Sequence, residues 1–446
     1  MNGFPDDFIL GTATASYQIE GAVLEDGRGA SIWDTFSHTP GKIYGGHTGD
    51  IACDHYHRYK ADIGLMKELG VKGYRFSIAW SRIFPEGKGK PNQKGVDFYS
   101  RLIETLLENG IDPMATLYHW DLPQALQNTG GWGNRDITDY YAQYAEYIFR
   151  VFGDRIKKWN TFNEPWVSAF AGHYGGRHAP GMTDFALAVQ VSHHLLLSHS
   201  KAIEAFRQLN KGGKIGLALN LYPTYPGSDS PDDRKAAYLA DGYHNRWFLD
   251  PILKGEYPGD MLDTYRERLH APVVQPGDME KMKANKIDFL GINYYFRKVI
   301  KNKNNNEILH YEEMKPLESE YTEMGWEIYP EGMLDLMRRI RTDYGDLHMA
   351  ITENGAAFKD DKRKNGIIQD DDRVKFLKQH LETANKAIHE GIKLDGFYIW
   401  SLLDNFEWGH GYSKRFGLFY TDYESQERIW KRSGLWLKEF IKENGL

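Results

Sequence analysis

The amino-acid sequence predicts an α/β fold: a parallel (β/α)8 barrel with long loops after its strands. Eight runs rich in β-branched and aromatic residues alternate along the chain with stretches of helical periodicity. Polar and aromatic residues follow directly after most of these runs, as they do in barrels whose functional groups lie at strand ends. No internal repeat longer than the strand–helix unit is visible, so we expect a single domain over residues 1–446.

The predicted strands are short apolar runs that end at turn-forming residues. Val, Ile, Tyr, Phe, Trp and Thr favour the pleated backbone of a sheet. The first run ends in small residues, which suit a crowded barrel interior. Pro165 stops the fourth run, because proline has no N–H to donate to a neighbouring strand. The eight predicted strands span residues 8–14, 72–78, 112–118, 159–162, 214–221, 287–295, 347–353 and 396–402.

Helices are predicted between the strands, where apolar residues recur every three or four positions. In one of them Leu102, Ile103, Leu106 and Leu107 form the apolar face. Gly70 and Gly391 directly follow the stretches that end at residues 69 and 390, which is typical of a helix C-terminus. The predicted helices span residues 61–69, 96–107, 138–152, 184–209, 236–249, 331–342, 371–390 and 430–442. The predicted long loops are 26–57, 81–93 and 297–325.

Composition narrows the classes of function. The 446 residues carry a net charge of −7 without strong clustering, which argues against nucleic acid as a partner. Apolar residues make up 41% of the chain, enough for a large core. No stretch approaches about 20 consecutive apolar residues, so no membrane span is expected. The first residues lack the pattern of a signal peptide and Cys53 is the only cysteine; both features favour a cytoplasmic protein.

Two predicted strands each end in a glutamate. Asn163 and Glu164 follow the fourth run, and Glu353 closes the seventh, just before the turn signal Asn354-Gly355. Because parallel barrel strands bring their carboxyl ends to one face, the two carboxyl groups are expected to face one cavity. Such a pair is the minimum equipment of most glycoside hydrolases. The alternative for Glu164 alone is a strand-end glutamate that faces solvent.

Other predicted strand ends carry groups that suit a polar ligand. Gln18 can donate to and accept from a sugar hydroxyl, although a loop glutamine can equally cap backbone. His119 and Trp120 follow the third run, where the alternative is a structural histidine. Arg75 lies inside a strand and is expected to have an anionic partner. The strand-end set is Gln18, His119, Asn163, Glu164, Asn293, Tyr295, Glu353, Trp400, Glu407 and Trp408.

The sequence gives no support for a metal site. His193, His194 and His199 lie on one predicted helix, but no two of them are four residues apart, the spacing by which helical histidines share a zinc ion. Two carboxyl groups can supply both proton transfer and a nucleophile. We therefore expect neither a metal nor an organic cofactor.

Three motifs resemble those of the family 1 glycoside hydrolases, the β-glucosidase family, and the likeness covers essentially the whole chain. Residues 8–21 are similar to the N-terminal signature of that family, 161–165 to its acid/base motif and 351–355 to its nucleophile motif. The bacterial intracellular branch is the part of the family that the chain resembles most. Departures from the usual family pattern occur at Leu10, Ala350, Gly409 and His410.

This resemblance implies a TIM barrel and a retaining β-glucosidase. Its substrates would be terminal non-reducing β-D-glucosyl residues of cello-oligosaccharides and of aryl or alkyl β-glucosides, with some β-galactosidase and β-fucosidase activity. Glu353 would be the nucleophile and Glu164 the general acid and base, with carboxyl groups about 5–5.5 Å apart. Arg75, Asn293 and Tyr295 would support Glu353, and the arginine and tyrosine would lower its pKa.

The resemblance also implies which residues bind the substrate. Asn163 would hold the 2-hydroxyl, and Trp400 would stack under the sugar ring. Trp166 and Trp326 would lie at the entrance for the aglycone. The implied substrate-binding set is Gln18, His119, Trp120, Asn163, Tyr295, Trp326, Trp400, Glu407 and Trp408.

Two alternatives to this function stay open. A 6-phospho-β-glucosidase would have the same fold, but Glu407 would repel a phosphate at C6. A non-catalytic sugar-binding barrel would be expected to lack one catalytic carboxyl group, whereas this chain has both Glu164 and Glu353. The sequence leaves open whether the chain forms a homo-oligomer.

Overall fold

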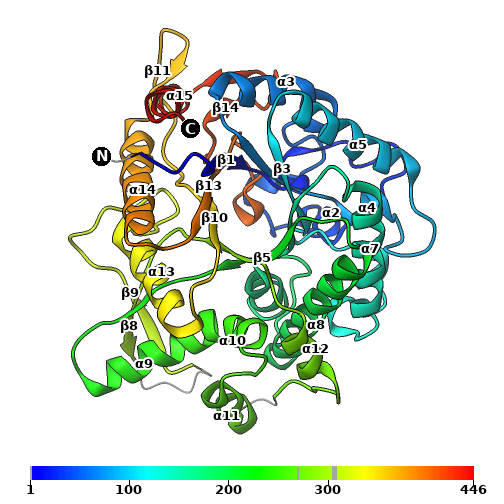
Figure 1. Cartoon of the computed structure of the whole chain (residues 1–446), viewed down its shortest axis with the longest axis vertical. Helices are drawn as coiled ribbons and strands as arrows, with labels where there is room; N and C mark the ends of the chain where they lie inside the picture. Colours follow the sequence, from blue (N-terminus) through cyan, green and yellow to red (C-terminus); the bar gives the residue numbers. More distant parts are fainter. Residues whose placement is uncertain (1–2, 269–270, 304–308) are drawn as a thin grey trace.

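The fold is a closed barrel of eight parallel strands, which confirms the predicted (β/α)8 architecture (Figure 1). The computed structural model describes residues 3–268, 271–303 and 309–446. Around the barrel the strands follow one another in chain order, and the last pairs with the first. The barrel strands are β1 Ile9–Ala13, β2 Gly73–Ser77, β3 Asp112–Tyr118, β4 Lys158–Asn163, β5 Lys214–Asn220, β7 Phe289–Asn293, β10 Met349–Asn354 and β13 Leu394–Trp400.

Helices surround the strands on all sides in the view of Figure 1. The longer ones bury an apolar face against the barrel, as their periodicity predicts. The main outer helices are α3 His55–Leu69, α5 Gln93–Glu108, α7 Ile137–Phe152, α8 Phe185–Leu209, α10 Trp247–Leu253, α12 Asp278–Ala284, α13 Pro330–Tyr344, α14 Asp371–His389 and α15 Arg432–Asn444. The other α-helices of the described residues are α1 Ser16–Ile19, α2 Ile32–Ser37, α4 Trp80–Ile83, α6 Gln124–Gln127, α9 Pro231–Asp241 and α11 Gly259–Arg268.

Closure of the barrel depends on a close approach between three strands. Gly11 of β1 pairs with Gly73 of β2 on one side and with Tyr398 of β13 on the other. A Cβ atom at Gly11 would lie 2.5 Å from the Gly73 backbone oxygen and 2.7 Å from the Tyr398 ring. Real Cβ atoms do not approach other atoms so closely, so glycine at position 11 lets the first strand join the last.

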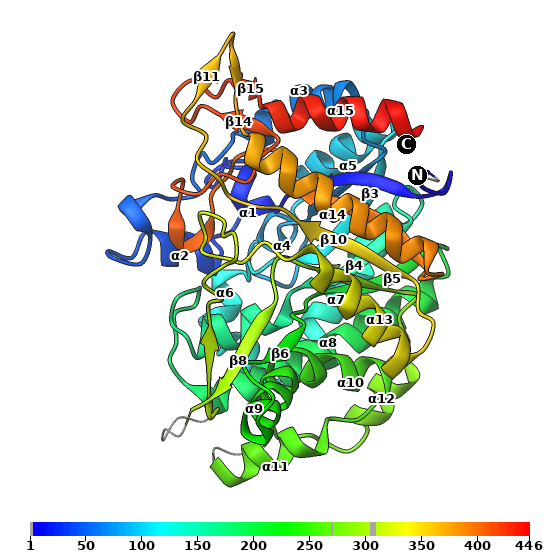
Figure 2. The same ribbon diagram turned by 90° about the vertical axis from the view of Figure 1, so that its left-hand side faces the viewer.

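Among the residues that the structure describes, three small sheets lie outside the barrel. One contains β6 Thr224–Pro226, β8 Lys298–Asn302 and β9 Tyr311–Met314, and the other two are the pairs β11 Arg363–Lys364 with β12 Ile367–Ile368 and β14 Phe419–Thr421 with β15 Arg428–Trp430. Figure 2 shows that β8, β11 and β14 gather on the same side as α1, α2 and α6, while both chain termini lie on the opposite side. The extended loops therefore build one elaborated end of the barrel.

The prediction of a loop over residues 26–57 was wrong in two places. Helix α2 lies within it, and helix α3 begins at His55 rather than at residue 61. α2 starts with a capping box, in which the Ser31 hydroxyl accepts from the Asp34 N–H and the Asp34 carboxylate accepts from the Ser31 N–H. Six residues are too few for a helical period to emerge from the sequence.

Three further expectations need correction on the outside of the barrel. The helix predicted over 236–249 is interrupted, because a π-helical turn Gly242–Arg246 separates α9 from α10, and α11 and α12 follow without having been predicted. The predicted loop 297–325 contains β8 and β9, while its residues 304–308 lie outside the described part of the chain. The predicted loop 81–93 likewise overlaps α4 and the start of α5.

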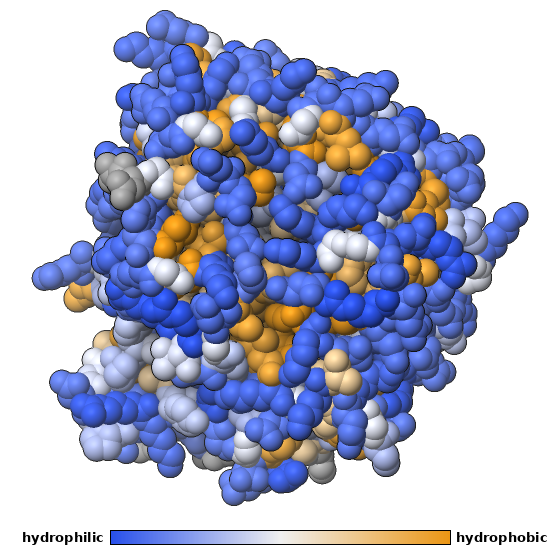
Figure 3. Space-filling model, viewed as in Figure 1, coloured by the Kyte–Doolittle hydropathy of each residue, from blue (hydrophilic) through white to orange (hydrophobic). Residues whose placement is uncertain are grey.

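The face of the molecule shown in Figure 3 is mainly hydrophilic. On the face shown in Figure 3, hydrophobic side chains form only limited patches between larger hydrophilic areas. Within residues 3–268, 271–303 and 309–446, each helix is too short or too polar to cross a membrane.

Candidate active site

The carboxyl ends of two barrel strands present the glutamates that the sequence singled out. Glu164 directly follows β4 with a φ of 46°, and its backbone N–H donates to the Ala218 oxygen of β5 at 2.8 Å. Glu353 lies in β10 opposite Asn293 of β7, next to a shift in the strand register. Such irregularities re-aim side chains at strand ends. Both carboxyl groups are buried, with exposures of 6% for Glu164 and 3% for Glu353.

Glu353 has a hydrogen-bond donor on each carboxyl oxygen. Arg75 Nη1 donates to Oε1 at 2.5 Å, and the Tyr295 hydroxyl donates to Oε2 at 2.6 Å. Arg75 therefore has the anionic partner that its place inside a strand required. Burial raises the pKa of Glu353, and the Arg75 charge and the Tyr295 hydrogen bond oppose that rise. The net direction is upward, whereas the sequence argument considered only the two groups that lower the pKa.

Glu164 has weaker support for its ionised form. Its Oε1 accepts one hydrogen bond, from Asn293 Nδ2 at 2.7 Å. Burial, followed by the negative charge of Glu353, raises the pKa of Glu164 to about 8. The sequence argument named only the charge of Glu353, but loss of solvent around the carboxyl group contributes more. Because Glu353 has a charged donor and Glu164 has only an amide, a proton shared by the pair resides on Glu164.

Two asparagines and a histidine continue this network. Asn163 Oδ1 accepts from Arg75 Nη2 at 2.7 Å and from Asn293 Nδ2 at 2.9 Å, so its Nδ2 must point the other way, toward His119 Nε2 at 2.9 Å. Burial and the nearby Arg75 charge hold the pKa of His119 far below its usual value. The neutral ring therefore accepts at Nε2 and carries its proton on Nδ1, a buried donor with no partner among the described residues.

Gln18 and Glu407 each point an unpaired oxygen into the interior. Gln18 Nε2 donates to Asn405 Oδ1 at 3.0 Å and to the Phe406 oxygen at 2.8 Å, while its Oε1 is buried without a partner in the part of the chain that is described. Glu407 Oε2 is likewise buried without a hydrogen-bond partner among the described residues. Burial, and then the charge of Glu353, raises the pKa of Glu407 to about 8. Glu407 therefore keeps its proton near neutral pH unless a donor lies against it, which differs from the charged group assumed from the sequence.

Indole and imidazole rings form a wall beside these polar groups. Trp408 lies 4.6 Å from Trp120 and 6.0 Å from His119 between ring centroids, and Trp400 stacks at 5.8 Å from His119. The Trp120 Nε1 donates to the Asn163 backbone oxygen at 2.9 Å, which ties the wall to the polar network. The structure thus brings His119, Trp120, Trp400 and Trp408 together, as predicted.

The two tryptophans expected at the aglycone entrance belong to different clusters. Trp326 packs at 5.0 Å from the Tyr295 ring and so lies beside the support of Glu353. Trp166 lies 4.9 Å from the His244 ring, and its buried Nε1 has no partner among residues 3–268, 271–303 and 309–446.

Several residues of this neighbourhood were missed by the sequence argument. Thr352 Oγ1 donates to Asn293 Oδ1 at 2.7 Å and so fixes the amide that Glu164 contacts. Asn220 ends β5 beside Asn293, where the strand-end rule could have found it. Trp33 of α2 lies 4.4 Å from Trp408, but no sequence signal placed residues 32–37 near the barrel.

Histidines and carboxylates are not arranged for a metal ion. No cluster of three or more His, Cys, Asp or Glu side chains that could hold a metal occurs in the described residues. His193 instead contacts Tyr257 and Asp278, and His199 contacts Thr161.

Comparison with known proteins assigns the family. The family model described as glycosyl hydrolase family 1 matches residues 1–446. The chain belongs to glycosyl hydrolase family 1. Beta-glucosidase A of Acetivibrio thermocellus, a family 1 relative, is 53% identical over 443 residues, which cover 99% of each chain. The family 1 β-glucosidase structure from Thermotoga maritima has a TM-score of 0.97 and 48% identity, with full coverage of both chains.

The chain is also similar to relatives with phosphorylated substrates in their names. The 6-phospho-beta-glucosidase GmuD of Bacillus subtilis is 40% identical over 460 residues, which cover 99% of this chain and 98% of that protein. Membership of the family confirms the resemblance found in the three sequence motifs and leaves the choice of substrate to the residues of the site.

Proposed function

We propose that the protein is a retaining β-glucosidase that removes terminal non-reducing β-D-glucosyl residues from cello-oligosaccharides and from aryl or alkyl β-glucosides. The observation that carries the proposal is the unequal support of two buried carboxyl groups. Glu353 has Arg75 and Tyr295 as donors, whereas Glu164 has one amide and a pKa of about 8. One group is thus prepared to be an anion and the other to be an acid. We extend the proposal to residues 1–446 as one catalytic domain.

In the first step the Glu353 carboxylate attacks the anomeric carbon while Glu164 gives its proton to the departing glycosidic oxygen. The bond from carbon to that oxygen breaks as the bond to Glu353 forms, and the aglycone leaves as an alcohol. A retaining reaction needs the two carboxyl groups about 5–5.5 Å apart, and this separation stays a prediction.

In the second step water replaces Glu353 on the sugar. Once Glu353 is an ester its negative charge is gone, and this charge is the second cause of the high pKa of Glu164. The proton affinity of Glu164 then falls, so its carboxylate can take a proton from the attacking water. Glucose leaves with its original anomeric configuration, and both carboxyl groups return to their starting states.

Sugar binding is assigned to the groups that the network leaves unpaired. The Nδ1 proton of His119, Oε1 of Gln18 and Oε2 of Glu407 are buried polar atoms without partners in the described chain. Hydroxyl groups can satisfy all three, since they both donate and accept. Asn163 is proposed to hold the 2-hydroxyl, and Trp400 and Trp408 to contact the apolar faces of the ring.

The alternative substrate, a 6-phosphorylated β-glucoside, needs cations near Glu407. Two cations follow it in the same loop, but both already have hydrogen-bond partners in the protein. Lys414 Nζ donates to the Glu323 backbone oxygen at 2.7 Å, and Arg415 Nη1 donates to the Asp404 carboxylate at 2.8 Å. A pKa of about 8 weakens the expected repulsion by Glu407. The engaged cations therefore argue against the phosphate more strongly than Glu407 does.

The deciding experiment compares kcat/KM for an aryl β-glucoside with kcat/KM for its 6-phosphate. We expect a higher value for the unphosphorylated glucoside and measurable activity on the β-galactoside and β-fucoside. A higher value for the phosphate would replace this proposal with the 6-phospho-β-glucosidase. Absence of turnover on every glycoside, with folded protein, would favour the non-catalytic sugar-binding barrel.

A further inference from the structure

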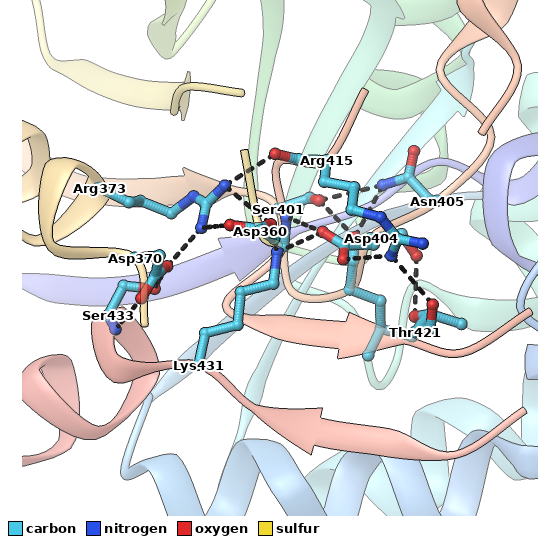
Figure 4. A network of polar contacts seen from close by, with 12 residues as sticks. Asp360, Asp370, Arg373, Ser401, Asp404, Asn405, Arg415, Thr421, Lys431 and Ser433 are labelled. Atoms are coloured by element: carbon cyan, nitrogen blue, oxygen red, sulfur yellow. Dashed lines mark hydrogen bonds and ion pairs between the residues drawn. The ribbon is translucent and has the colours of Figure 1, made fainter. Parts of the chain in front are cut away.

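A buried network of charged side chains lies next to the end of β13 (Figure 4). Lys431 and Asp404 are both fully buried, at 0% exposure, and the remaining members surround them. The network contains three cations, Arg373, Arg415 and Lys431, and three carboxyl groups, Asp360, Asp370 and Asp404. The proposed mechanism uses none of these six residues. Buried charges are costly unless they are fully paired, so their position needs an explanation.

Asp404 is the member of the network that the chain fixes from every side. Its Oδ1 accepts from Lys431 Nζ at 2.5 Å and from the Gly417 N–H at 2.8 Å, and its Oδ2 accepts from Arg415 Nη1 at 2.8 Å. Its backbone oxygen accepts from the Thr421 hydroxyl at 2.9 Å. A Cβ atom at Gly417 would lie 2.1 Å from the Asp404 nitrogen, so this close contact requires glycine.

The far side of the network anchors it to the outer helices. Lys431 also pairs with Asp360, and Arg373 of α14 pairs with Asp360 and Asp370. The Ser433 N–H, in the first turn of α15, donates to Asp370 Oδ1 at 2.8 Å. Burial opposes ionisation of Asp360, yet the Lys431 and Arg373 charges hold its pKa below the usual value. The Asp360 carboxyl group is therefore ionised, and the network joins two helices to the strand end.

The segment that Asp404 fixes, residues 402–408, carries one polar group assigned to the sugar hydroxyls and holds a second one in place. Glu407 lies three residues after Asp404. Gln18 uses its amide nitrogen on this segment alone, through Asn405 Oδ1 and the Phe406 backbone oxygen, and the Phe406 N–H donates back to the Gln18 backbone oxygen at 3.1 Å. The unpaired oxygens of Gln18 and Glu407 are thus both oriented by the segment 402–408.

We propose that Asp404, held by Lys431 and Arg415, is a positioning residue that sets how the segment 402–408 presents Glu407 and Gln18 to the sugar hydroxyls. The inference rests on the proposed function, because it uses the assignment of these two groups to the sugar. Glu164 and Glu353 come from β4 and β10, and neither contacts the network through any hydrogen bond or ion pair that the structure records. A fault in the network should therefore impair recognition of the hydroxyls more than bond cleavage.

The test combines variants with substrates that differ in one hydroxymethyl group. Arg415→Met and Lys431→Met each remove one donor of Asp404 while keeping a long side chain. For each variant, kcat/KM is measured on an aryl β-glucoside and on the matching aryl β-xyloside, which lacks the 6-hydroxyl. The ratio of the two values measures the benefit that the enzyme draws from that hydroxyl.

Arg339→Met is the matched control. Arg339 is a partly buried arginine that pairs with Asp241 and Asp343 on α9 and α13, away from the segment 402–408. Its loss should lower the thermal midpoint, as loss of Arg415 should, but leave the substrate ratio unchanged. Glu407→Gln is measured in the same assay to establish the contribution of the carboxyl group itself.

We expect Arg415→Met and Lys431→Met to lower the glucoside-to-xyloside ratio by about tenfold, the loss of one charge-assisted hydrogen bond, with a larger effect on KM than on kcat. An unchanged ratio in folded Arg415→Met would overturn the proposal, and this variant decides the matter if Lys431→Met fails to fold. An unchanged ratio in Glu407→Gln would also overturn it, because the segment would then present nothing to the sugar. Failure of the wild type to hydrolyse the glucoside would instead refute the proposed function.

Discussion

At Glu353 two donors meet one carboxyl group, and both favour its ionised form. Arg75 and Tyr295 bind the two oxygens at 2.5 Å and 2.6 Å. Replacing Glu353 by alanine should reduce turnover of aryl glucosides to less than about one part in 10³, because the covalent step is lost. Added azide or formate should restore part of it by entering the vacated position. Folded Glu353→Ala that azide cannot rescue would refute the nucleophile assignment.

Glu164 should matter in proportion to the basicity of the leaving group. An acid helps most when the departing oxygen holds its charge poorly, and such help is worth about 10²–10⁴-fold. Glu164→Gln should therefore lose far more activity on alkyl glucosides and cellobiose than on activated aryl glucosides. The measurement is kcat/KM over a series of leaving groups for both proteins, and equal losses across the series would remove Glu164 from this role.

The pKa of Glu164 predicts the basic limb of the pH profile. The acid must be protonated to act. We therefore expect kcat/KM to retain its full value at pH values below about 8 and to fall as the pH rises through the Glu164 pKa of about 8. On the acidic side activity should fall as Glu353 takes up a proton. Because the groups interact, the two limbs report the pair rather than single residues.

Two variants separate Glu164 from Glu407, whose pKa is also about 8. With an activated aryl glucoside, Glu164→Gln should abolish the basic limb, whereas Glu407→Gln should retain it while raising KM. A basic limb that survives in Glu164→Gln and disappears in Glu407→Gln would reverse the assignment.

Sequence reasoning found the strand-end residues better than it found their surroundings. Glu164, Glu353 and Arg75 stood out because charged groups in or beside buried strands need a reason. The dominance of burial over charge in the pKa of Glu164 could not be foreseen, because the depth of a side chain depends on loops that are distant in sequence. Trp33 was missed for the same reason.

At the scale of elements, predictions succeeded where a long stretch of the sequence kept one periodicity. They failed where contacts between distant segments determine the secondary structure. Helix α8 spans Phe185–Leu209, as predicted to within one residue. The π-helical turn Gly242–Arg246 left no trace in the apolar pattern on either side of it. The strand β8 pairs with β6 and β9, and pairing between separate segments cannot be read from a charged, Asn-rich stretch.

The capping box of α2 offers a test of an element that supports the site. Ser31→Ala removes the hydroxyl that accepts from the Asp34 N–H and should lower the free energy of unfolding by about 1 kcal/mol. Because α2 carries Trp33, which lies 4.4 Å from Trp408, KM for aryl glucosides should also rise.

The matched control for that change is Ser230→Ala. Ser230 caps α9, where its hydroxyl accepts from the Asp233 N–H at 3.1 Å. The loss of stability, measured by thermal or denaturant unfolding, should be similar to that of Ser31→Ala. KM should stay unchanged. Equal effects of both variants on KM would show that α2 does not support the site.

For the whole molecule, barrel closure predicts opposite results for the same substitution at two glycines. A methyl group at Gly11 would meet the Gly73 oxygen at 2.5 Å, so Gly11→Ala should destabilise the protein by about 1–3 kcal/mol. Gly64 lies on the exposed face of α3, where a Cβ atom would meet nothing within 4 Å, so Gly64→Ala should stabilise by about 0.5–1 kcal/mol. Thermal midpoints of the two variants should lie on opposite sides of the wild-type value, and a shift of Gly11→Ala upward would contradict the closure argument.

The pairing of β1 with β13 also has a consequence for synthesis of the chain. Ile9 lies opposite Gly396, so the first strand finds its second neighbour only when nearly the whole polypeptide has left the ribosome. Until then the growing sheet has two open edges, which can pair with other chains. The carboxyl groups proposed to be catalytic, Glu164 directly after β4 and Glu353 in β10, take their final places within the same closed ring. During refolding, recovery of activity should therefore lag behind the formation of helix, because contacts so distant in sequence form slowly.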